Sequence, residues 1–455
     1  MKFSQTLPLL PLTSAFLIPN ADVFEDIEKT GRKIVDHTQI GFERVHHNLG
    51  DKFAKSIDNV KNTGDRVNHR IHEVGYDLES WLQGSSSEDI RQDSDHPNHP
   101  PHHGRPHHPP DHEKPNNTVY ELISKSKYTT KLAKLLDDFP DLIHTLNNTK
   151  INHTIFAPID SAFEKIPDHG KKPSKELLEK ILLYHISDDF YPAGRVLHSY
   201  TIPTLLEPKN LGHKQRLTVR VTLKGPTLNF YSKLVAVNIF GVNGVIHGID
   251  SLLVPPPQVA TIIDLLPGEF STLELGLAKT GLFEKLNSTD YPHNGGTLFA
   301  PSNFAFKKLG PKINAFLFSK YGVKYLKALL EYHMVVDQTL YSDAFFNQSE
   351  GNDQSDTAQN TGNFHVDLPT VLKDRYLSVD STRYGPFVEI RINAFSRVTI
   401  HDGVASDGVI QVVSNVLIPP KTHQGEHVYW EGEEMSVDDL KERLEPLVGS
   451  ENLEL

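Results

Sequence analysis

A histidine and an aspartate stand three residues apart in the apolar run NGVIHGIDSLLVPP, which covers residues 243–256. His247 and Asp250 are residue types that can act together in acid–base chemistry. The run has the composition of a β-strand, however, and side chains three positions apart on a strand point to opposite faces. We therefore expect the two to be poor direct partners, with His247 on the same face as Ile249 at the edge of a core.

A second concentration of reactive side chains lies in residues 84–116, which are rich in proline, histidine and acidic residues. Neutral imidazoles bind Zn²⁺, Cu²⁺ or Ni²⁺, but the prolines keep this segment extended, so any site would be weak and exchangeable. The alternatives are a stiff spacer with incidental histidines and a segment that becomes cationic in a lumen at about pH 5. The candidate metal ligands are His96, His99, His102, His103, His107, His108 and His112.

Signatures of hydrolases and nucleotide-dependent enzymes are absent from the sequence, which has no G-x-S-x-G, H-E-x-x-H or P-loop motif. Ser161 precedes Glu164 by three residues, which is the spacing of a helix-capping box and not that of a nucleophile. The chain also has no cysteine, so thiol nucleophiles and cysteine zinc sites are excluded. We predict a protein that is not an enzyme and needs no cofactor.

The 455 residues exceed one ordinary domain, since a prior of roughly 150 residues per domain suggests about three units. The apolar fraction of 38% indicates that a sizeable part of the chain is solvated. The formal net charge is −12 and we find no strongly basic segment, so no nucleic-acid partner is expected. Without disulfides a secreted chain depends on core burial, which favours domains above about 100 residues.

Residues 1–21 predict a secretory signal peptide, with Lys2 followed by an apolar stretch and small residues near Ala15 and Ala21. No later run of about 18 apolar residues predicts a transmembrane span. The expected location is therefore the secretory pathway, ending in the vacuole lumen or in the extracellular space and cell wall. Five N-x-S/T sequons are candidate glycosylation sites: Asn116, Asn147, Asn152, Asn287 and Asn347.

The segments that flank the body of the chain are helical or extended. Residues 22–83 show apolar spacings of three, four and seven, which predict an amphipathic helical arm interrupted by glycines. The arm could dock on the body, pair with itself or lie on a membrane surface. Residues 84–116 predict a disordered linker. Residues 421–455 form an acidic tail, in which Ser436 and Asp439 predict a short capped helix.

Beyond residue 117 the chain repeats itself, with an offset that grows from 143 to 148, 155 and 164 residues. This pattern predicts two copies of one domain, the second with insertions at 347–363 and 401–407, where surface loops lengthen at little entropic cost. The matched pairs are TIFAPIDSAF at 154–163 with TLFAPSNFAF at 297–306, LLYHI at 182–186 with LEYHM at 330–334, VNIF at 237–240 with INAF at 392–395, and GVIHGIDSLLVPP at 244–256 with GVIQVVSNVLIPP at 408–420.

Each copy has the same predicted order of elements. Helical segments come first, and a short buried strand that ends at Pro158 follows them in the first copy. Pro173 and Ser174 then mark the start of another helix, and strands of period two close the copy. Helices that lead into a run of strands predict an α+β domain with a mainly antiparallel sheet or sandwich.

The repeated segments resemble the fasciclin domain. The resemblance rests on the T-[VI]-F-A-P strand, the Tyr-His pair at a helix end, and the closing N-G-x-[IV]-H-x-[IV]-D strand with its double proline. It covers 117–257 and 258–420, about two thirds of the chain. The resemblance implies two tandem fasciclin-like domains, each a wedge-shaped β-sandwich with packed helices, in a secreted or surface protein of fungal type.

The resemblance also marks candidate binding residues, because the Tyr-His neighbourhood and the closing segment of related fasciclin proteins have been linked to integrin binding. The alternative is that each tyrosine buries its ring and each histidine caps the last carbonyls of its helix. In the second copy Asp407, Gln411 and Ser414 stand where the first has Asn243, His247 and Asp250, so one shared polar task is not expected. The candidates are Tyr184, His185, His247, Asp250, Tyr332 and His333.

Together these features predict a non-enzymatic adhesion or protein-binding module of the secretory pathway lumen, vacuole or cell surface. The expected partner is a protein or a cell-wall glycan, and contact with a membrane surface stays open. One alternative is a weak zinc- or copper-binding protein that acts through the linker. Another, an enzyme acting on glycans or esters, lacks a nucleophile or carboxylate motif.

Overall fold

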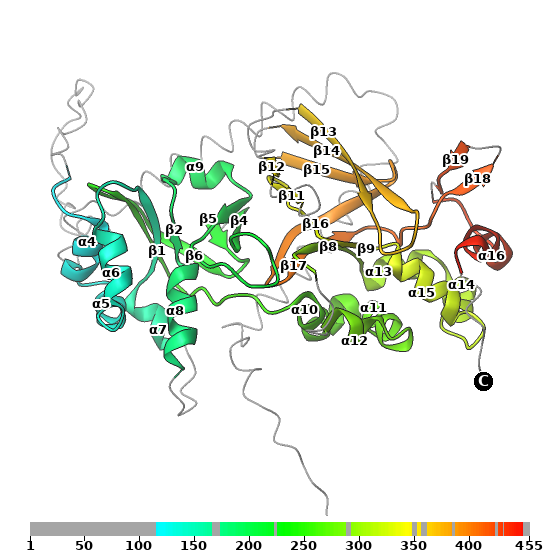
Figure 1. Ribbon diagram of the computed structural model, residues 1–455, viewed down its shortest axis with the longest axis horizontal. Helices are drawn as coiled ribbons and strands as arrows, with labels where there is room; N and C mark the ends of the chain where they lie inside the picture. Colours follow the sequence, from blue (N-terminus) through cyan, green and yellow to red (C-terminus); the bar gives the residue numbers. More distant parts are fainter. Residues whose placement is uncertain are drawn as a thin grey trace, which may run out of the picture. The chain divides into compact units, whose positions relative to one another are not determined.

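The computed structural model describes residues 115–165, 173–222, 225–287, 293–347, 353–355, 362–384, 387–423, 426–430 and 432–448. The predicted signal peptide, helical arm and nearly all of the linker lie outside these residues. The chain divides into two compact units, each with its own helices and sheet (Figure 1). Unit 1 comprises residues up to 196 and 220–254, and unit 2 comprises 197–219 and everything from 255 onward. The segment 197–219 of the first repeat therefore belongs to unit 2.

The helices of the first repeat are short, and a side chain caps the start of two of them. The Thr118 hydroxyl accepts from the Glu121 N–H, and the Glu121 carboxylate accepts from the Thr118 N–H, which fixes the first helix. Ser174 caps a later helix as predicted. Ser161 lies inside a helix that starts at Asp160, so the capping prediction for Ser161 is wrong. The helices are α4 (Val119–Lys125), α5 (Thr130–Leu136), α6 (Pro140–Asn147), α7 (Asp160–Glu164), α8 (Lys175–Tyr184) and α9 (Ala193–His198).

The strands of the first repeat form one sheet in the order β2-β1-β7-β6-β5-β4-β3, and the division between the units falls within β4. β1 and β7 pair in parallel, with β2 outside β1 at the edge of the sheet, and all six residues of each are buried. The sequence suggested that His247 lies at the edge of a core. That prediction is wrong, because His247 lies inside the core. The strands are β1 (His153–Pro158), β2 (Ile186–Ser187), β3 (Thr201–Pro203), β4 (Arg216–Thr222), β5 (Gly225–Leu228), β6 (Ser232–Gly241) and β7 (Gly244–Ile249).

The helices of the second repeat pack against one end of its sheet, with α10, α11 and α13 in contact with β8 (Gly296–Pro301) or β17 (Gly408–Val413) (Figure 1). The C-terminal helix α16 starts at the predicted Ser436–Asp439 capping box and buries Leu440 and Leu444 in the same core. Within the described residues no helix is both long and apolar enough to cross a membrane. The helices are α10 (Val259–Leu265), α11 (Pro267–Lys279), α12 (Leu282–Asn287), α13 (Asn303–Lys308), α14 (Pro311–Leu317), α15 (Val323–Glu331), α16 (Val437–Leu444) and the short η4 (Glu445–Leu447).

The main sheet of the second repeat has the order β13-β14-β15-β16-β17-β8-β9, again with a parallel pair, β17 and β8. A three-stranded sheet, β10-β11-β12, and a hairpin of β18 and β19 accompany it. The strands are β8 (Gly296–Pro301), β9 (Met334–Val336), β10 (Gln338–Leu340), β11 (Phe345–Asn347), β12 (Asp353–Ser355), β13 (Gly362–Pro369), β14 (Tyr376–Tyr384), β15 (Phe387–Ile392), β16 (Ser396–Ala405), β17 (Gly408–Val413), β18 (Lys421–His423) and β19 (Glu426–Val428).

One of the four sequence matches between the copies is wrong. Asn229 and Asn393 occupy the same turn, each with positive φ (48° and 51°), and each donates to the tyrosine of its own Tyr-His pair. The sequence INAF therefore corresponds to residues 228–231, at the offset of 164 that the closing strand also has. Residues 401–407 correspond to residues 237–243 at the same offset. The insertion predicted at 401–407 is therefore wrong. Between His333 and Asn393 the offset grows from 148 to 164, so most of the extra residues of the second copy lie in this stretch.

Candidate functional site

The Tyr-His pair of the first copy is buried at the end of α8. Tyr184 and His185 are 0% and 2% exposed. The His185 Nδ1–H donates to the Ile181 carbonyl at 2.7 Å, and its Nε2 accepts from the Leu253 N–H at 2.9 Å. A carbonyl can only accept and an N–H can only donate, so the ring is neutral with its proton on Nδ1. The imidazole thus ties the helix end to the segment after β7.

The second copy repeats this arrangement atom for atom. The His333 Nδ1–H donates to the Leu329 carbonyl at 2.7 Å, and its Nε2 accepts from the Leu417 N–H at 2.8 Å. The Tyr332 hydroxyl accepts from the Asn393 amide at 2.9 Å, as Tyr184 does from Asn229. Burial lowers the pKa of His185 and His333 to about 4. Both pairs therefore hold loops in place as neutral groups, which is the arrangement that the capping alternative describes.

His247 and its counterpart Gln411 have the same structural role, because each side chain donates to one backbone carbonyl and accepts from one backbone N–H. The His247 Nε2–H donates to the Tyr191 carbonyl at 2.8 Å, and its Nδ1 accepts from the Asn238 N–H at 3.4 Å. Gln411 donates through Nε2 to the Leu340 carbonyl at 2.7 Å and accepts through Oε1 from the Asp402 N–H at 3.2 Å. Both side chains are 0% exposed. Burial also lowers the pKa of His247 to about 4.

Asp250 has partners of its own, as the strand alternation predicted. Its carboxylate accepts from the Lys233 N–H at 2.8 Å and pairs with the Lys165 ammonium at 3.2 Å. Ser414 takes the first of these contacts in the second copy, because its hydroxyl accepts from the Arg397 N–H at 3.1 Å. The residue after β7 or β17 therefore anchors the start of the preceding long strand in both copies.

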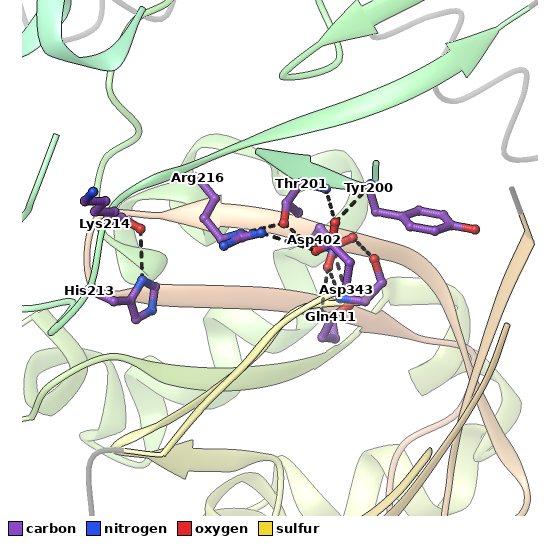
Figure 2. Close-up of polar contacts among 9 residues, drawn as sticks. Tyr200, Thr201, His213, Lys214, Arg216, Asp343, Asp402 and Gln411 are labelled. Atoms are coloured by element: carbon purple, nitrogen blue, oxygen red, sulfur yellow. Dashed lines mark hydrogen bonds and ion pairs between the residues drawn. The ribbon is translucent and has the colours of Figure 1, made fainter. Parts of the chain in front are cut away.

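Two buried carboxylates in unit 2, Asp343 and Asp402, form a polar cluster that the sequence reasoning missed (Figure 2). They are 3% and 1% exposed. Asp402 lies in β16 at the offset-164 position of Asn238, and both adopt positive φ, 59° and 60°. Asp402 accepts from the Ser342 N–H at 2.7 Å, as Asn238 accepts from the Ala193 N–H at 2.8 Å. A correct repeat alignment would have located Asp402, but not Asp343, whose counterpart is Gly194.

Asp343 binds the segment that the first repeat contributes to unit 2. Its carboxylate accepts from the Tyr200 N–H at 3.0 Å, the Thr201 N–H at 2.6 Å and the Thr201 hydroxyl. Arg216 pairs with this carboxylate at 3.8 Å and donates through Nε to the Thr201 hydroxyl at 2.6 Å (Figure 2). The Thr218 hydroxyl adds a bond to the Asp402 carbonyl at 2.6 Å. The cluster thus fixes both β3 and β4 to the second repeat.

Aromatic rings enclose the guanidinium side of this cluster. The His213 ring stacks on Phe346 with centroids 3.8 Å apart, and Arg216 lies 5.5 Å from the centre of the Tyr341 ring. Burial lowers the pKa of His213 to about 4, so this ring is neutral and does not add charge. Burial also raises the pKa of the Asp343 carboxyl, which Arg216 opposes and Asp402 reinforces. The cluster is therefore poor in positive charge.

The predicted glycosylation sites lie among the described residues, whereas the predicted metal ligands do not. Asn116 and Asn152 are exposed, whereas the Asn147 carboxamide accepts from the Thr118 hydroxyl at 2.7 Å. Asn347 is half-buried in β11, and Asn287 is the last residue of α12. The seven linker histidines lie outside the described residues. Among the residues that are described, no three His, Asp or Glu side chains are grouped to hold a metal ion.

The repeated architecture is that of a known family. The sequence model of the fasciclin domain matches residues 127–255 and 268–419. The chain belongs to the fasciclin domain family, and the predicted α+β fold with two tandem domains is confirmed. Fasciclin domains have adhesion and protein-binding roles.

Individual relatives cover this chain to different extents. Aurofusarin biosynthesis cluster protein S of Gibberella zeae is 30% identical over 73% of this chain and 85% of its own length. Fasciclin-1 of Schistocerca americana is 26% identical over 62% of this chain, which spans 42% of that relative. Transforming growth factor-beta-induced protein ig-h3 of Sus scrofa is 29% identical, with 49% of this chain and 32% of the relative covered. A solved FAS1 domain pair from the insect cell adhesion molecule Fasciclin I matches 64% of this chain and 96% of its own at 20% identity, with a TM-score of 0.32.

Proposed function

We propose that the chain is a non-enzymatic adhesion or protein-binding module of the secretory pathway, located in the vacuole lumen or at the cell surface. The observation that carries this proposal is that the candidate polar side chains form hydrogen bonds inside the domains. In both copies the Tyr-His pair and the residue at the position of His247 or Gln411 are buried, and the histidines and Gln411 are bonded to backbone atoms. They maintain a shape, so recognition falls to the outer surfaces of the two domains.

The family and the surface chemistry support this role. Relatives that share the fold include proteins named fasciclin-1 and periostin, and secreted or extracellular placement agrees with exposed sequons at Asn116 and Asn152. The partner we propose is a protein or a cell-wall glycan, and contact with a membrane surface remains part of the proposal.

The test is retention of beads that carry the full chain on cell walls and on membranes of the secretory fraction. Beads coated with an unrelated acidic protein are the control, because they reproduce the net charge of −12 without the fold. Retention above this control, unchanged by Tyr184→Phe, supports the proposal, since the Tyr184 hydroxyl has an internal partner. Equal retention on both kinds of bead, or turnover of ester or glycoside substrates by the purified chain, would refute it.

A second candidate function rests on the linker, where seven histidines occur between residues 96 and 112. Imidazoles at this density favour weak binding of Zn²⁺ or Cu²⁺. Calorimetric titration of the full chain and of a chain lacking residues 84–114 separates the two candidates. Binding at micromolar strength that disappears with the deletion supports metal handling. If neither titration gives a heat of binding, metal handling is excluded.

A further inference from the structure

The cluster around Asp343 and Asp402 holds two buried carboxylates and a single guanidinium, that of Arg216. Each carboxylate also accepts three hydrogen bonds. Asp343 takes three from Tyr200 and Thr201, and Asp402 takes the Ser342 N–H and hydroxyl and the Gln411 amide. Hydrogen bonds satisfy the oxygen lone pairs, but they do not cancel the second negative charge. A buried unpaired charge is costly in a medium of low dielectric constant.

The first copy shows that the structural task of Asp402 does not need a charge. Its counterpart Asn238 makes the same bond with a neutral amide, to the Ala193 N–H at 2.8 Å. Gly194 stands where Asp343 would be, so the first copy has no second carboxylate at this place. The charge excess is therefore specific to the second copy, where Asp343 binds the segment from Tyr200 to Arg216.

We propose that Asp343 and Asp402 form a proton-operated latch, in which uptake of one proton by the pair tightens the segment 200–216 on the second fasciclin domain. Protonation of Asp343 leaves the cluster with one carboxylate and one guanidinium, so its formal charges balance. The two backbone N–H groups of Tyr200 and Thr201 keep their acceptor, because a neutral carboxyl still accepts through its carbonyl oxygen. The latch therefore strengthens as pH falls.

The neutral groups next to the two carboxylates, His213 and Tyr341, add no opposing charge, so they favour a latch that strengthens as pH falls. His213 is neutral over the relevant range, because burial lowers its pKa to about 4. Tyr341 faces the cluster, and burial raises the pKa of its phenol, so it carries no charge. On the Tyr200 side, the Arg383 guanidinium and the His401 imidazole lie against the Tyr200 ring.

The sign follows from the pKa of Asp343, which burial and Asp402 raise above its ordinary value. A carboxyl with a raised pKa in the docked state binds its proton more tightly there than in the released state. Docking is then weakest at neutral pH and strengthens as pH falls through the raised pKa toward the ordinary value. This is opposite to the usual effect of acid on paired carboxylates.

Hydrogen exchange of the full chain, read by mass spectrometry, tests the latch directly. Peptides that cover residues 197–206 report on the Tyr200 and Thr201 amides, at about pH 7.5 and about pH 5 after correction for intrinsic exchange rates. The wild-type segment should exchange at least about threefold more slowly at the lower pH. Asp343→Asn should exchange slowly at both, since its carboxamide reproduces the bonds of a protonated carboxyl. Asp402→Asn, which copies Asn238 of the first domain, should also lose the pH dependence.

The control variant is Asp407→Asn. Asp407 is another buried carboxyl of unit 2, but it caps the start of α10 through the Val259 N–H at 2.8 Å. It should leave the pH dependence of the segment intact. The latch is refuted if wild-type exchange is equal at both pH values or faster in acid, or if both Asp343→Asn and Asp402→Asn retain the wild-type pH dependence. Neither outcome depends on the binding proposal above.

Discussion

Replacing His247 by glutamine should make the first fasciclin domain less sensitive to acid, although His185 of the same domain keeps its own acid-dependent loss. The second domain already uses Gln411 to bridge the same two backbone groups, so the variant keeps both hydrogen bonds. It loses the stacking of His247 on Phe156, whose centroids are 5.7 Å apart. At neutral pH we expect a cost of no more than about 1 kcal/mol. His247→Ala, which leaves the Tyr191 carbonyl and the Asn238 N–H without a partner, should cost about 3 kcal/mol.

Acid changes the comparison because the pKa of His247 falls from 6.5 to about 4 on folding. A histidine with a lowered pKa in the folded state contributes stability above its unfolded pKa, and this stability is lost as pH falls from 6.5 toward 4. At about pH 5 the unfolded chain has bound the proton and the folded chain has not. The resulting loss is about 2 kcal/mol, at 1.36 kcal/mol for each pH unit. His247→Gln removes this loss.

Urea unfolding of the full chain at about pH 7 and about pH 5, followed by circular dichroism, measures the difference. In a Trp81→Phe background, Trp430 fluorescence follows the second unit separately, since Trp430 is buried there. His365→Gln serves as the control, because His365 is exposed and its neighbour Asp380 raises its pKa. The reasoning fails if His247→Gln and wild type lose equal stability between the two pH values, or if the glutamine variant is as unstable as the alanine variant at neutral pH.

Three further outcomes follow from the same contacts. His333→Ala should lower the free energy of unfolding of the second unit by about 2 to 4 kcal/mol, since the Leu329 carbonyl and the Leu417 N–H lose their partner; urea unfolding followed by Trp430 fluorescence measures this. Leu440→Ala should cost about 2 to 5 kcal/mol in the same assay, because this side chain of α16 is 0% exposed in the core. In a chain expressed through a secretory pathway, Asn152→Gln should remove a glycan, seen as a mass shift, whereas Asn147→Gln should not, because the Asn147 carboxamide is bonded to Thr118.

The repeats and the closing strands could be predicted from the sequence because they are continuous blocks with the same residues in the same order. The Asn-x-Phe match between 237–240 and 392–395 was wrong, because the second asparagine belongs to a turn defined by positive φ and by a bond to Tyr332. The periodicity of a strand also placed His247 at an edge, but β7 lies between β1 and β6 and is covered on both faces.

The carboxylate cluster was out of reach of the sequence for a different reason. Asp343 has no counterpart in the first copy, and its partners Thr201 and Arg216 lie more than 120 residues away along the chain. Nothing local marks such a contact, since a single aspartate in the stretch YSDAFF reads as an ordinary loop residue. Only the packing of β3 and β4 with the second repeat brings the three side chains together.

The pH titration of the buried imidazoles tests most directly the claim that the candidate polar residues hold the fold. NMR spectra of the full chain with labelled histidine, assigned through His185→Gln, His247→Gln and His333→Gln, would follow each ring. All three should stay neutral down to about pH 5, with the proton of His185 and His333 on Nδ1 and that of His247 on Nε2, while the exposed His365 titrates above 6.5. Titration of His185, His247 or His333 near 6.5 would show that the ring is open to water and available to a partner, and would contradict the account.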